Sequence, residues 1–258
     1  MPQTNLLKEK SILIIGGSGL IGSTLVRACL EEGGRVLCAS RNPDVNSFSD
    51  LSVKESDRLF YHGVDVTLPN SVDELFKFVR ENERRVDAIV NCSFPRGRGF
   101  GAKFEDVNYK EFCDNISAHL GSVFQVCQSA AKYFSEVGSG NIINISSIYG
   151  VINPRFEIYE GTPMTKEVEY SVCKSAIIHL TGYLAKYLKG RDIQVNCVSP
   201  GGVYNGEPDK FVERYNAHCS KKGMLAGQDV VGTIMFLLSD HARFVNGQNL
   251  VVDDGFCL

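Results

Sequence analysis

Short, mostly apolar runs rich in β-branched residues recur along the chain, and each of the first five is followed by a stretch with helical spacing. A run without polar alternation is typical of a strand that is covered on both faces, which is the situation of a parallel sheet. The runs are Ile12–Ile15, Val36–Ala39, Ala88–Val90, Ile142–Ile145, Val195–Val198 and Leu250–Val252.

The intervals between these runs carry amphipathic, helix-forming patterns. Alternation of strand and helix over the whole chain predicts a doubly wound α/β sheet. Neither a repeat, nor a low-complexity tract, nor a linker interrupts it, so we expect a single Rossmann-type domain over residues 1–258. The expected helices are Leu20–Glu32, Val72–Glu83, Tyr109–Phe134, Glu169–Leu188 and Gln228–Leu238.

Composition restricts the class of partner. The formal net charge of -3 argues against a general nucleic-acid binder. Nine cysteines without a Cys-x-x-Cys pair are typical of a reducing compartment. Because no apolar run has the length of a signal peptide or a membrane span, we expect a cytoplasmic protein. The size of the chain is that of a single-domain enzyme, and we expect a small-molecule substrate. We predict no metal site.

Three segments interrupt the strand–helix rhythm, near residues 93–104, 152–168 and 201–225. Each is expected to follow the carboxyl end of a strand, which is the edge where open α/β sheets bind ligands. We therefore expect these segments to form the walls of a substrate pocket.

The segment GGSGLIG lies between the first expected strand and the first expected helix. It matches Gly-x-Gly-x-x-Gly and also Gly-x-x-Gly-x-x-Gly. Glycines let backbone N–H groups approach a pyrophosphate at the positive end of the following helix, so the segment predicts a dinucleotide site. The residues expected to bind the cofactor here are Gly16, Gly17, Ser18, Gly19, Leu20, Ile21 and Gly22.

The second expected strand is followed by Ser40 and Arg41. A carboxylate at that place would accept hydrogen bonds from the adenosine ribose and repel a 2′-phosphate. A hydroxyl and a guanidinium suit the phosphate instead, so NADP(H) is the preferred expectation and NAD(H) remains open.

Tyr170 and Lys174 are spaced i and i+4, so on a helix both face the same side. To act as a base near neutral pH, a tyrosine must lower its pKa by roughly three units, or ~4 kcal/mol. The lysine ammonium and the positive ring of an oxidised nicotinamide can supply much of that shift. Tyr149, Tyr159 and Tyr183 have no basic residue four positions later.

The motifs of this chain, and their order along the sequence, resemble those of the short-chain dehydrogenase/reductase family. The resemblance runs from about Lys10 to Gly255 and rests on the glycine turn, Asp65-Val66, Asn91, Ser147, Tyr170-x-x-x-Lys174 and Ser199-Pro200-Gly201. It implies a mostly parallel, seven-stranded sheet with helices on both faces. It also implies that Tyr170 transfers the proton, that Ser147 orients the substrate oxygen, and that Lys174 activates the tyrosine and binds the nicotinamide ribose.

The resemblance implies further cofactor contacts at the ends of the later strands. These are Asp65, Val66, Asn91, Cys92, Ser93, Tyr170, Lys174, Pro200, Gly201 and Val203. Two of these sites depart from the family pattern, because Asn91-Cys92-Ser93 replaces Asn-Ala-Gly and no threonine follows Pro200-Gly201 at the usual place.

The family often has an asparagine in the helix before the catalytic strand, where it holds a water in a proton relay. His119 occupies that place here, and Asn115 lies one turn earlier. A histidine would titrate near the working pH. Three readings remain open: His119 serves the relay, Asn115 substitutes for it, or His119 only packs at a helix interface.

The segment from Ser147 to Lys174, the motif HLGS and the motif DDGF more closely resemble the flagellin-modification protein A subgroup of this family. That subgroup is associated with bacterial sugar pathways for flagellin or surface polysaccharide. The 23-residue step from Ser147 to Tyr170 is longer than is usual in the family. The additional residues are expected to shape which substrate enters.

Arginines in these segments suggest the substrate's chemistry. Arg96, Arg98 and Arg155 are candidate phosphate ligands, because arginine forks and neighbouring glycines suit a phosphate. The alternative is that they pair with nearby acids such as Glu157 or Glu105 in a solvated loop.

We therefore expect an NADP(H)-dependent oxidoreductase that transfers a hydride to or from a carbonyl/alcohol carbon, on a phosphorylated or nucleotide-activated sugar. One alternative is a sugar epimerase or dehydratase that retains its cofactor. Another is a catalytically dead dinucleotide-binding regulator. By resemblance, helices Tyr109–Phe134 and Glu169–Leu188 are expected to form a shared interface in a homotetramer or homodimer.

Overall fold

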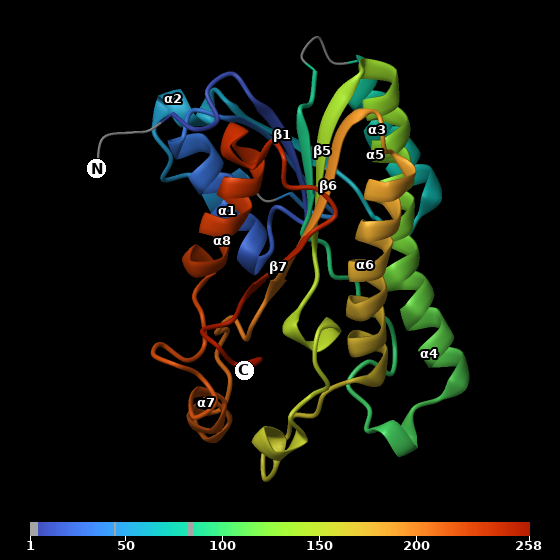
Figure 1. Cartoon of the computed structure of the whole chain (residues 1–258), viewed down its shortest axis with the longest axis vertical. Helices are drawn as coiled ribbons and strands as arrows, with labels where there is room; N and C mark the ends of the chain where they lie inside the picture. The colour runs from blue at the N-terminus through green and yellow to red at the C-terminus, as the bar shows by residue number, and fades with distance from the viewer. Residues whose placement is uncertain (1–4, 44, 82–84) are drawn as a thin grey trace.

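A seven-stranded, all-parallel sheet forms the centre of the computed structural model, which describes residues 5–43, 45–81 and 85–258 (Figure 1). The strand order is β3-β2-β1-β4-β5-β6-β7, so the predicted doubly wound, Rossmann-type arrangement is confirmed. The strands are β1 (Ser11–Ile15), β2 (Arg35–Ser40), β3 (Leu59–Gly63), β4 (Ala88–Asn91), β5 (Ser139–Ile145), β6 (Asp192–Pro200) and β7 (Asn249–Val252).

The central strands explain the unbroken apolar runs. Residues Ala88–Asn91 of β4 are all buried, and so are the last four residues of β1 and of β5. Their parallel pairing brings all carboxyl ends to one edge of the sheet. The ligand-binding edge is therefore built from the turns that follow β1, β4, β5 and β6.

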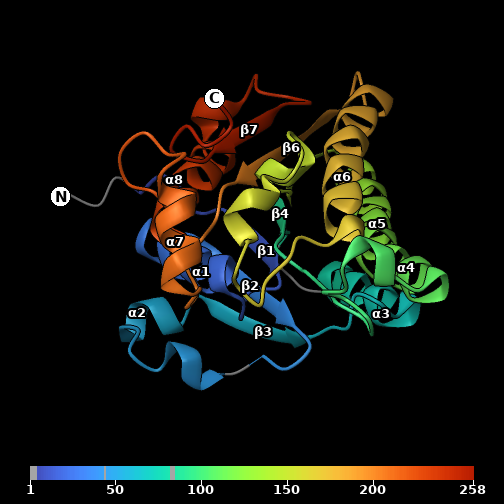
Figure 2. The same cartoon turned by 90° about the horizontal axis from the view of Figure 1, so that it is seen from below.

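Helices cover both faces of the sheet, as Figures 1 and 2 show. The helices are α1 (Leu20–Glu31), α2 (Val53–Ser56), α3 (Pro69–Glu81), α4 (Tyr109–Ile116), α5 (Ser122–Val137), α6 (Val168–Tyr187), α7 (Asp209–Asn216) and α8 (Gly227–Leu238). Helices α1 and α8 pack together over one face, and α3, α5 and α6 cover the other. No helix in the described ranges combines the length and the apolar character that crossing a membrane requires.

Two predicted helices differ from the observed ones. The predicted end of the second helix, Glu83, lies outside the described residues. The predicted single helix Tyr109–Phe134 is wrong in its middle, because a π-helical turn at Ser117–Gly121 separates α4 from α5. The Ser122 hydroxyl donates to the His119 carbonyl across this wider turn at 2.9 Å.

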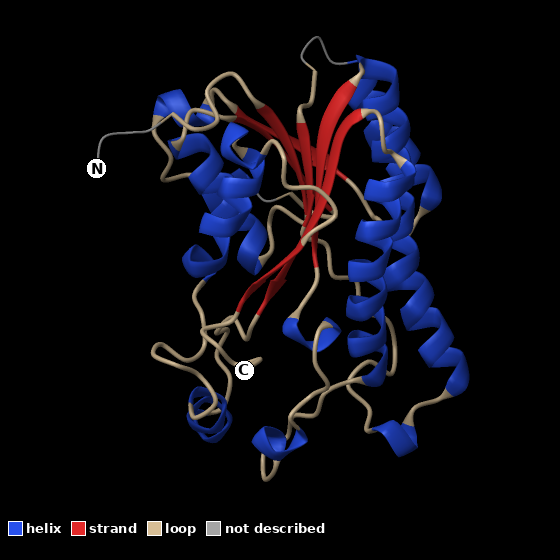
Figure 3. Cartoon of the chain, viewed as in Figure 1, coloured by secondary structure: helices blue, strands red, loops and turns tan. Residues whose placement is uncertain are grey.

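Besides the two apolar clusters on the faces of the sheet, a third lies beyond its carboxyl edge. Figure 3 shows loops and short helices in this place, below the sheet. The third cluster joins the segment 152–168, helix α7 and the C-terminal turn. The Phe256 ring is fully buried and stacks on Tyr215 with the centroids 4.3 Å apart. The Asp254 carboxylate accepts hydrogen bonds from the backbone N–H groups of residues 221–223. The loops that follow β5 and β6 are therefore packed against each other rather than extended into solvent.

Candidate active site

A cavity of about 800 Å³ opens at the carboxyl edge of the sheet. Its lining comes from the glycine turn after β1 and from the loops after β4, β5 and β6. All three segments that interrupt the sequence rhythm contribute residues to it. One cavity thus contains both the predicted dinucleotide turn and the predicted substrate loops.

The glycine turn has no room for side chains. Gly16 has φ +80°, and a Cβ there would lie 2.8 Å from the Cys92 carbonyl carbon. A Cβ at Gly22 would lie 2.2 Å from the Gly16 carbonyl oxygen, and one at Gly17 would lie 2.5 Å from the Cys38 sulfur. Glycine is therefore required for α1 to start this close to β4, and the turn fits a dinucleotide pyrophosphate at the helix N-terminus.

Polar side chains surround the far end of the cavity, beyond the glycine turn. The Ser18 and Ser40 hydroxyls are hydrogen-bonded at 2.7 Å, and Arg41 lines the cavity with an exposed side chain. Asp65 accepts from the Thr67 hydroxyl at 2.7 Å and from its backbone N–H at 2.9 Å. The bond from the Thr67 hydroxyl is the main cause that lowers the pKa of Asp65. Val66 also lines this end.

The turn after β4 forms the middle of the cavity. Asn91 is buried, and its side-chain oxygen accepts from the Ser93 hydroxyl at 2.6 Å. Cys92 and Ser93 line the cavity itself. Burial raises the pKa of the Cys92 thiol to about 12, so this thiol is neutral. Across the cavity, the lining includes the predicted residues Pro200, Gly201 and Val203.

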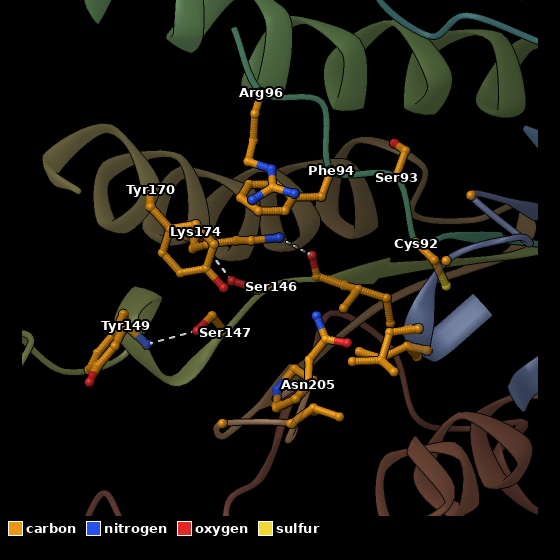
Figure 4. Close-up of a pocket in the computed structure, with 18 of the residues that line it drawn as sticks. Cys92, Ser93, Phe94, Arg96, Ser146, Ser147, Tyr149, Tyr170, Lys174 and Asn205 are labelled. Atoms are coloured by element: carbon orange, nitrogen blue, oxygen red, sulfur yellow. Dashed lines mark hydrogen bonds between the residues drawn. The ribbon is translucent and has the colours of Figure 1, made fainter. Parts of the chain in front are cut away.

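Ser147, Tyr170 and Lys174 come together at the inner wall (Figure 4). Ser147 follows β5, and its hydroxyl accepts a hydrogen bond from the Tyr149 N–H at 3.2 Å. Tyr170 and Lys174 lie one turn apart on α6, with the Lys174 Nζ 5.6 Å from the Tyr170 ring centroid. The same Nζ donates to the Ile145 carbonyl at 2.9 Å. The i, i+4 spacing predicted that Tyr170 and Lys174 share one side of a helix, and in the structure both face the cavity from α6.

Burial decides the protonation of these groups. Burial raises the pKa of Tyr170, and the Ser147 hydroxyl offsets only part of that rise. Burial lowers the pKa of Lys174 to about 8. The lowering of the Tyr170 pKa that base catalysis needs, expected from Lys174 together with an oxidised nicotinamide ring, stays a prediction. A protonated Tyr170 and a mostly charged Lys174 are the forms present at neutral pH.

Burial also keeps two other tyrosines of this region protonated. It raises the pKa of Tyr149 to about 12, and it raises the pKa of Tyr159. The Tyr159 hydroxyl donates to the Tyr149 hydroxyl at 3.0 Å. Both tyrosines line the cavity, and neither has a lysine four residues later.

His119 and Asn115 lie behind the cavity wall rather than on it. The His119 ring is buried 4.8 Å from the Phe94 ring, and burial with the charge of Lys174 lowers its pKa to about 3. The expected titration near working pH is therefore wrong. The Asn115 amide is occupied: it accepts from Gly97 N–H at 2.8 Å and donates to the Arg98 carbonyl at 3.0 Å.

The three candidate arginines have different surroundings. Arg96 lines the cavity with its guanidinium over the Phe94 ring, 5.3 Å from the centroid. The Arg98 side chain is 95% exposed and pairs with Glu111 at 3.6 Å. Arg155 donates to the carbonyls of Phe256 and Leu258 at the C-terminus. Only Arg96 of the three is part of the cavity lining.

The cavity lining includes further residues that were not identified from the sequence, among them Phe94, Lys166 and Glu167. The Phe94 ring meets the Tyr170 ring edge-on at 5.3 Å. The Lys166 Nζ lies over the Tyr170 ring, 3.8 Å from its centroid, and pairs with Glu167 at 3.3 Å. Lys166 precedes Tyr170 by four residues, so testing the i−4 position as well as i+4 would have found it.

Comparisons with known proteins point to one family. The family model described as enoyl-(acyl carrier protein) reductase matches residues 18–257. The post-translational flagellin modification protein A of Campylobacter coli is 37% identical over 98% of this chain and 100% of its own length. The 7alpha-hydroxysteroid dehydrogenase of Bacteroides fragilis is 28% identical over 98% of this chain and 96% of its own.

A solved structure agrees with these relatives. The short chain dehydrogenase from Leptospira borgpetersenii, crystallised with bound NAD+, has a TM-score of 0.87 and 32% identity. The match covers 98% of this chain and 94% of that chain. The similarity therefore extends over the whole sheet and the cavity loops.

Proposed function

This chain belongs to the short-chain dehydrogenase/reductase family, and we propose that Ser147, Tyr170 and Lys174 are its catalytic residues. The protein is an oxidoreductase of this family with a dinucleotide cofactor. One observation carries the assignment: Ser147, Tyr170 and the buried Lys174 line the same cavity as the glycine turn. This arrangement supports transfer of a hydride to or from a carbonyl/alcohol carbon.

The protein residues handle the proton and the substrate oxygen. A bound nicotinamide dinucleotide supplies or accepts the hydride. The Ser147 hydroxyl donates a hydrogen bond to the carbonyl oxygen, and Tyr170 donates its proton to that oxygen as the alcohol forms. Burial raises the pKa of Tyr170, which is consistent with its role as proton donor in the reductive direction. The Lys174 ammonium then stabilises the phenolate that is left on Tyr170.

We propose NADP(H) as the preferred cofactor. The end of β2 carries Ser40 and Arg41 in place of a carboxylate, and the Arg41 guanidinium is exposed on the cavity. A guanidinium binds a 2′-phosphate with charge-assisted hydrogen bonds. NAD(H) is the competing cofactor, since the similar Leptospira enzyme was crystallised with NAD+.

A phosphorylated or nucleotide-activated sugar is the proposed substrate, in a flagellin-modification or surface-glycan pathway. The relative that is 37% identical supports this, since its name places it in flagellin modification. Arg96 on the cavity supports an anionic substrate. The nine cysteines, which are all free thiols and all lie in the described ranges, support a reducing, cytoplasmic location.

Helices α4, α5 and α6 are the proposed interface of a homotetramer or homodimer. The three helices lie side by side (Figure 1). Their exposed apolar side chains include Phe124, Tyr183 and Tyr187. The Tyr183 and Tyr187 rings are stacked with centroids 6.2 Å apart. Large exposed apolar patches are typical of protein interfaces.

Light scattering of the purified protein tests this interface. We expect a mass of two or four 28.4 kDa chains, and a smaller mass for Tyr187→Glu, because a charge at the patch centre opposes burial. A wild-type mass of one chain would contradict the proposal.

Replacing Tyr170 by phenylalanine tests the proton transfer. We expect Tyr170→Phe to lower kcat by roughly 100- to 10,000-fold, because it removes a general acid. NADPH affinity, measured by fluorescence titration, should change little. The control is Tyr183→Phe, which lies on the same helix but is 61% exposed and outside the cavity. Full activity in Tyr170→Phe would point to another acid, and absence of turnover in the wild type, with NADPH still bound, would point to a dinucleotide-binding regulator.

Replacing Arg41 by alanine tests the cofactor preference. We expect Arg41→Ala to weaken NADPH binding roughly ten- to a hundredfold, because charge-assisted hydrogen bonds to the 2′-phosphate are lost. NADH binding should remain within about twofold of wild type. Arg243→Ala, at an exposed residue outside the cavity, is the matched control. Equal losses for both cofactors would rule out a phosphate contact at Arg41.

A further inference from the structure

Two cationic side chains, Arg96 and Lys166, line the cavity next to Tyr170, and the dinucleotide turn needs neither. We propose that they form a binding site for a phosphate monoester carried by the substrate near its reacting carbonyl carbon. This inference rests on the proposed function, which places the carbonyl oxygen at Tyr170 and Ser147.

Lys166 is held close to the reacting groups. Its side chain is 19% exposed, and its Nζ lies 3.8 Å from the Tyr170 ring centroid. Burial lowers the pKa of Lys166, and the Glu167 carboxylate opposes that shift. An ammonium has three N–H donors, so pairing with Glu167 leaves donors for a ligand. Glu167 thus helps to keep a charged lysine beside Tyr170.

Arg96 brings a second cation to the same place. Among the residues that the structure describes, its guanidinium has no ion pair or hydrogen bond, and it lies over the Phe94 ring. Its charge also lowers the pKa of Lys166, so the two cations repel each other. In Figure 4 Arg96 extends over Phe94 on the side of Tyr170 and Lys174. A bound anion would relieve this repulsion.

The acids on the cavity lining are too few to neutralise this pair. They are Asp65, Glu167 and Glu207 in the described part of the chain. Asp65 is held by Thr67 near Arg41, and Glu207 accepts from the Asn205 N–H at 2.6 Å. Only Glu167 pairs with Lys166 or Arg96, which leaves one positive charge in excess.

The geometry favours phosphate over carboxylate. A phosphate monoester carries about −1.5 to −2 charges and three acceptor oxygens at pH 7. It can accept from the Arg96 fork and from the Lys166 ammonium together. Because Lys166 contacts the Tyr170 ring itself, a phosphate held there lies within a few bonds of a carbonyl oxygen at Tyr170.

The long Ser147–Tyr170 interval then serves to position Lys166 in the cavity. Lys166 belongs to the segment 152–168, which is anchored at Arg155 to the C-terminal carbonyls and at Tyr159 to Tyr149. These contacts fix the path of the segment back to α6. The additional residues therefore bring a cation to the substrate.

Phosphate titration of the enzyme saturated with NADP+ tests the site, since the bound cofactor fills its own phosphate positions. By calorimetry, Arg96→Gln and Lys166→Gln should each weaken inorganic phosphate binding at least tenfold, or about 1.4 kcal/mol. Arg98→Gln is the matched control, because Arg98 lies on the same loop but outside the cavity lining, and it should leave the affinity unchanged. Lys166→Arg, which keeps the charge, should bind phosphate within a few fold of wild type.

Steady-state kinetics with a matched pair of keto-sugars, one phosphorylated, give a second readout. Each glutamine variant should raise KM for the phosphorylated sugar at least tenfold more than it raises KM for the other. Equal phosphate affinity in wild type and both variants, or a wild-type preference for the unphosphorylated sugar, would overturn the site. The phosphate titration does not require turnover, so it separates failure of this site from failure of the proposed function, which fails if NADPH does not bind or Tyr170→Phe keeps full activity.

Discussion

The contact between helix α6 and the end of strand β5 holds the candidate active site together. The Lys174 ammonium donates to the Ile145 carbonyl at 2.9 Å, and the Ser146 hydroxyl donates to the Lys174 carbonyl at 2.7 Å. A Cβ at Gly150 would lie 2.6 Å from the Lys174 backbone, so the turn after β5 can approach only as glycine. This contact fixes Ser147 on the strand side against Tyr170 on the helix side.

The same contact sets the electrostatics. Lys174 is buried deeply enough to lower its pKa to about 8, and Tyr170 is buried deeply enough to raise its pKa. Lys166 approaches the Tyr170 ring from the segment before α6. Tyr170 therefore has two lysines beside it, Lys174 from its own helix and Lys166 from the segment that precedes the helix.

Sequence reasoning succeeded where local spacing decides the structure. The apolar runs predicted the parallel sheet, and the i, i+4 rule identified Tyr170 with Lys174. It failed where tertiary contacts decide: nothing local distinguishes Arg96, on the cavity, from Arg155, which binds the C-terminal carbonyls. The π turn at Ser117–Gly121 was also missed, because the apolar spacing of these residues does not differ from that of an α-helix. Lys166 depends on the folded path of a segment that lacks regular periodicity.

The central claim is that Tyr170 serves a net hydride transfer to a phosphorylated keto-sugar. The most direct test measures NADPH consumed and alcohol formed across a panel of keto-sugars, sugar phosphates and nucleotide-sugars. We predict that one NADPH is consumed for each alcohol formed, with a phosphorylated keto-sugar turned over best. Sugar conversion without net NADPH consumption would contradict the account and indicate an epimerase or dehydratase, and absence of turnover with every compound would contradict it as well.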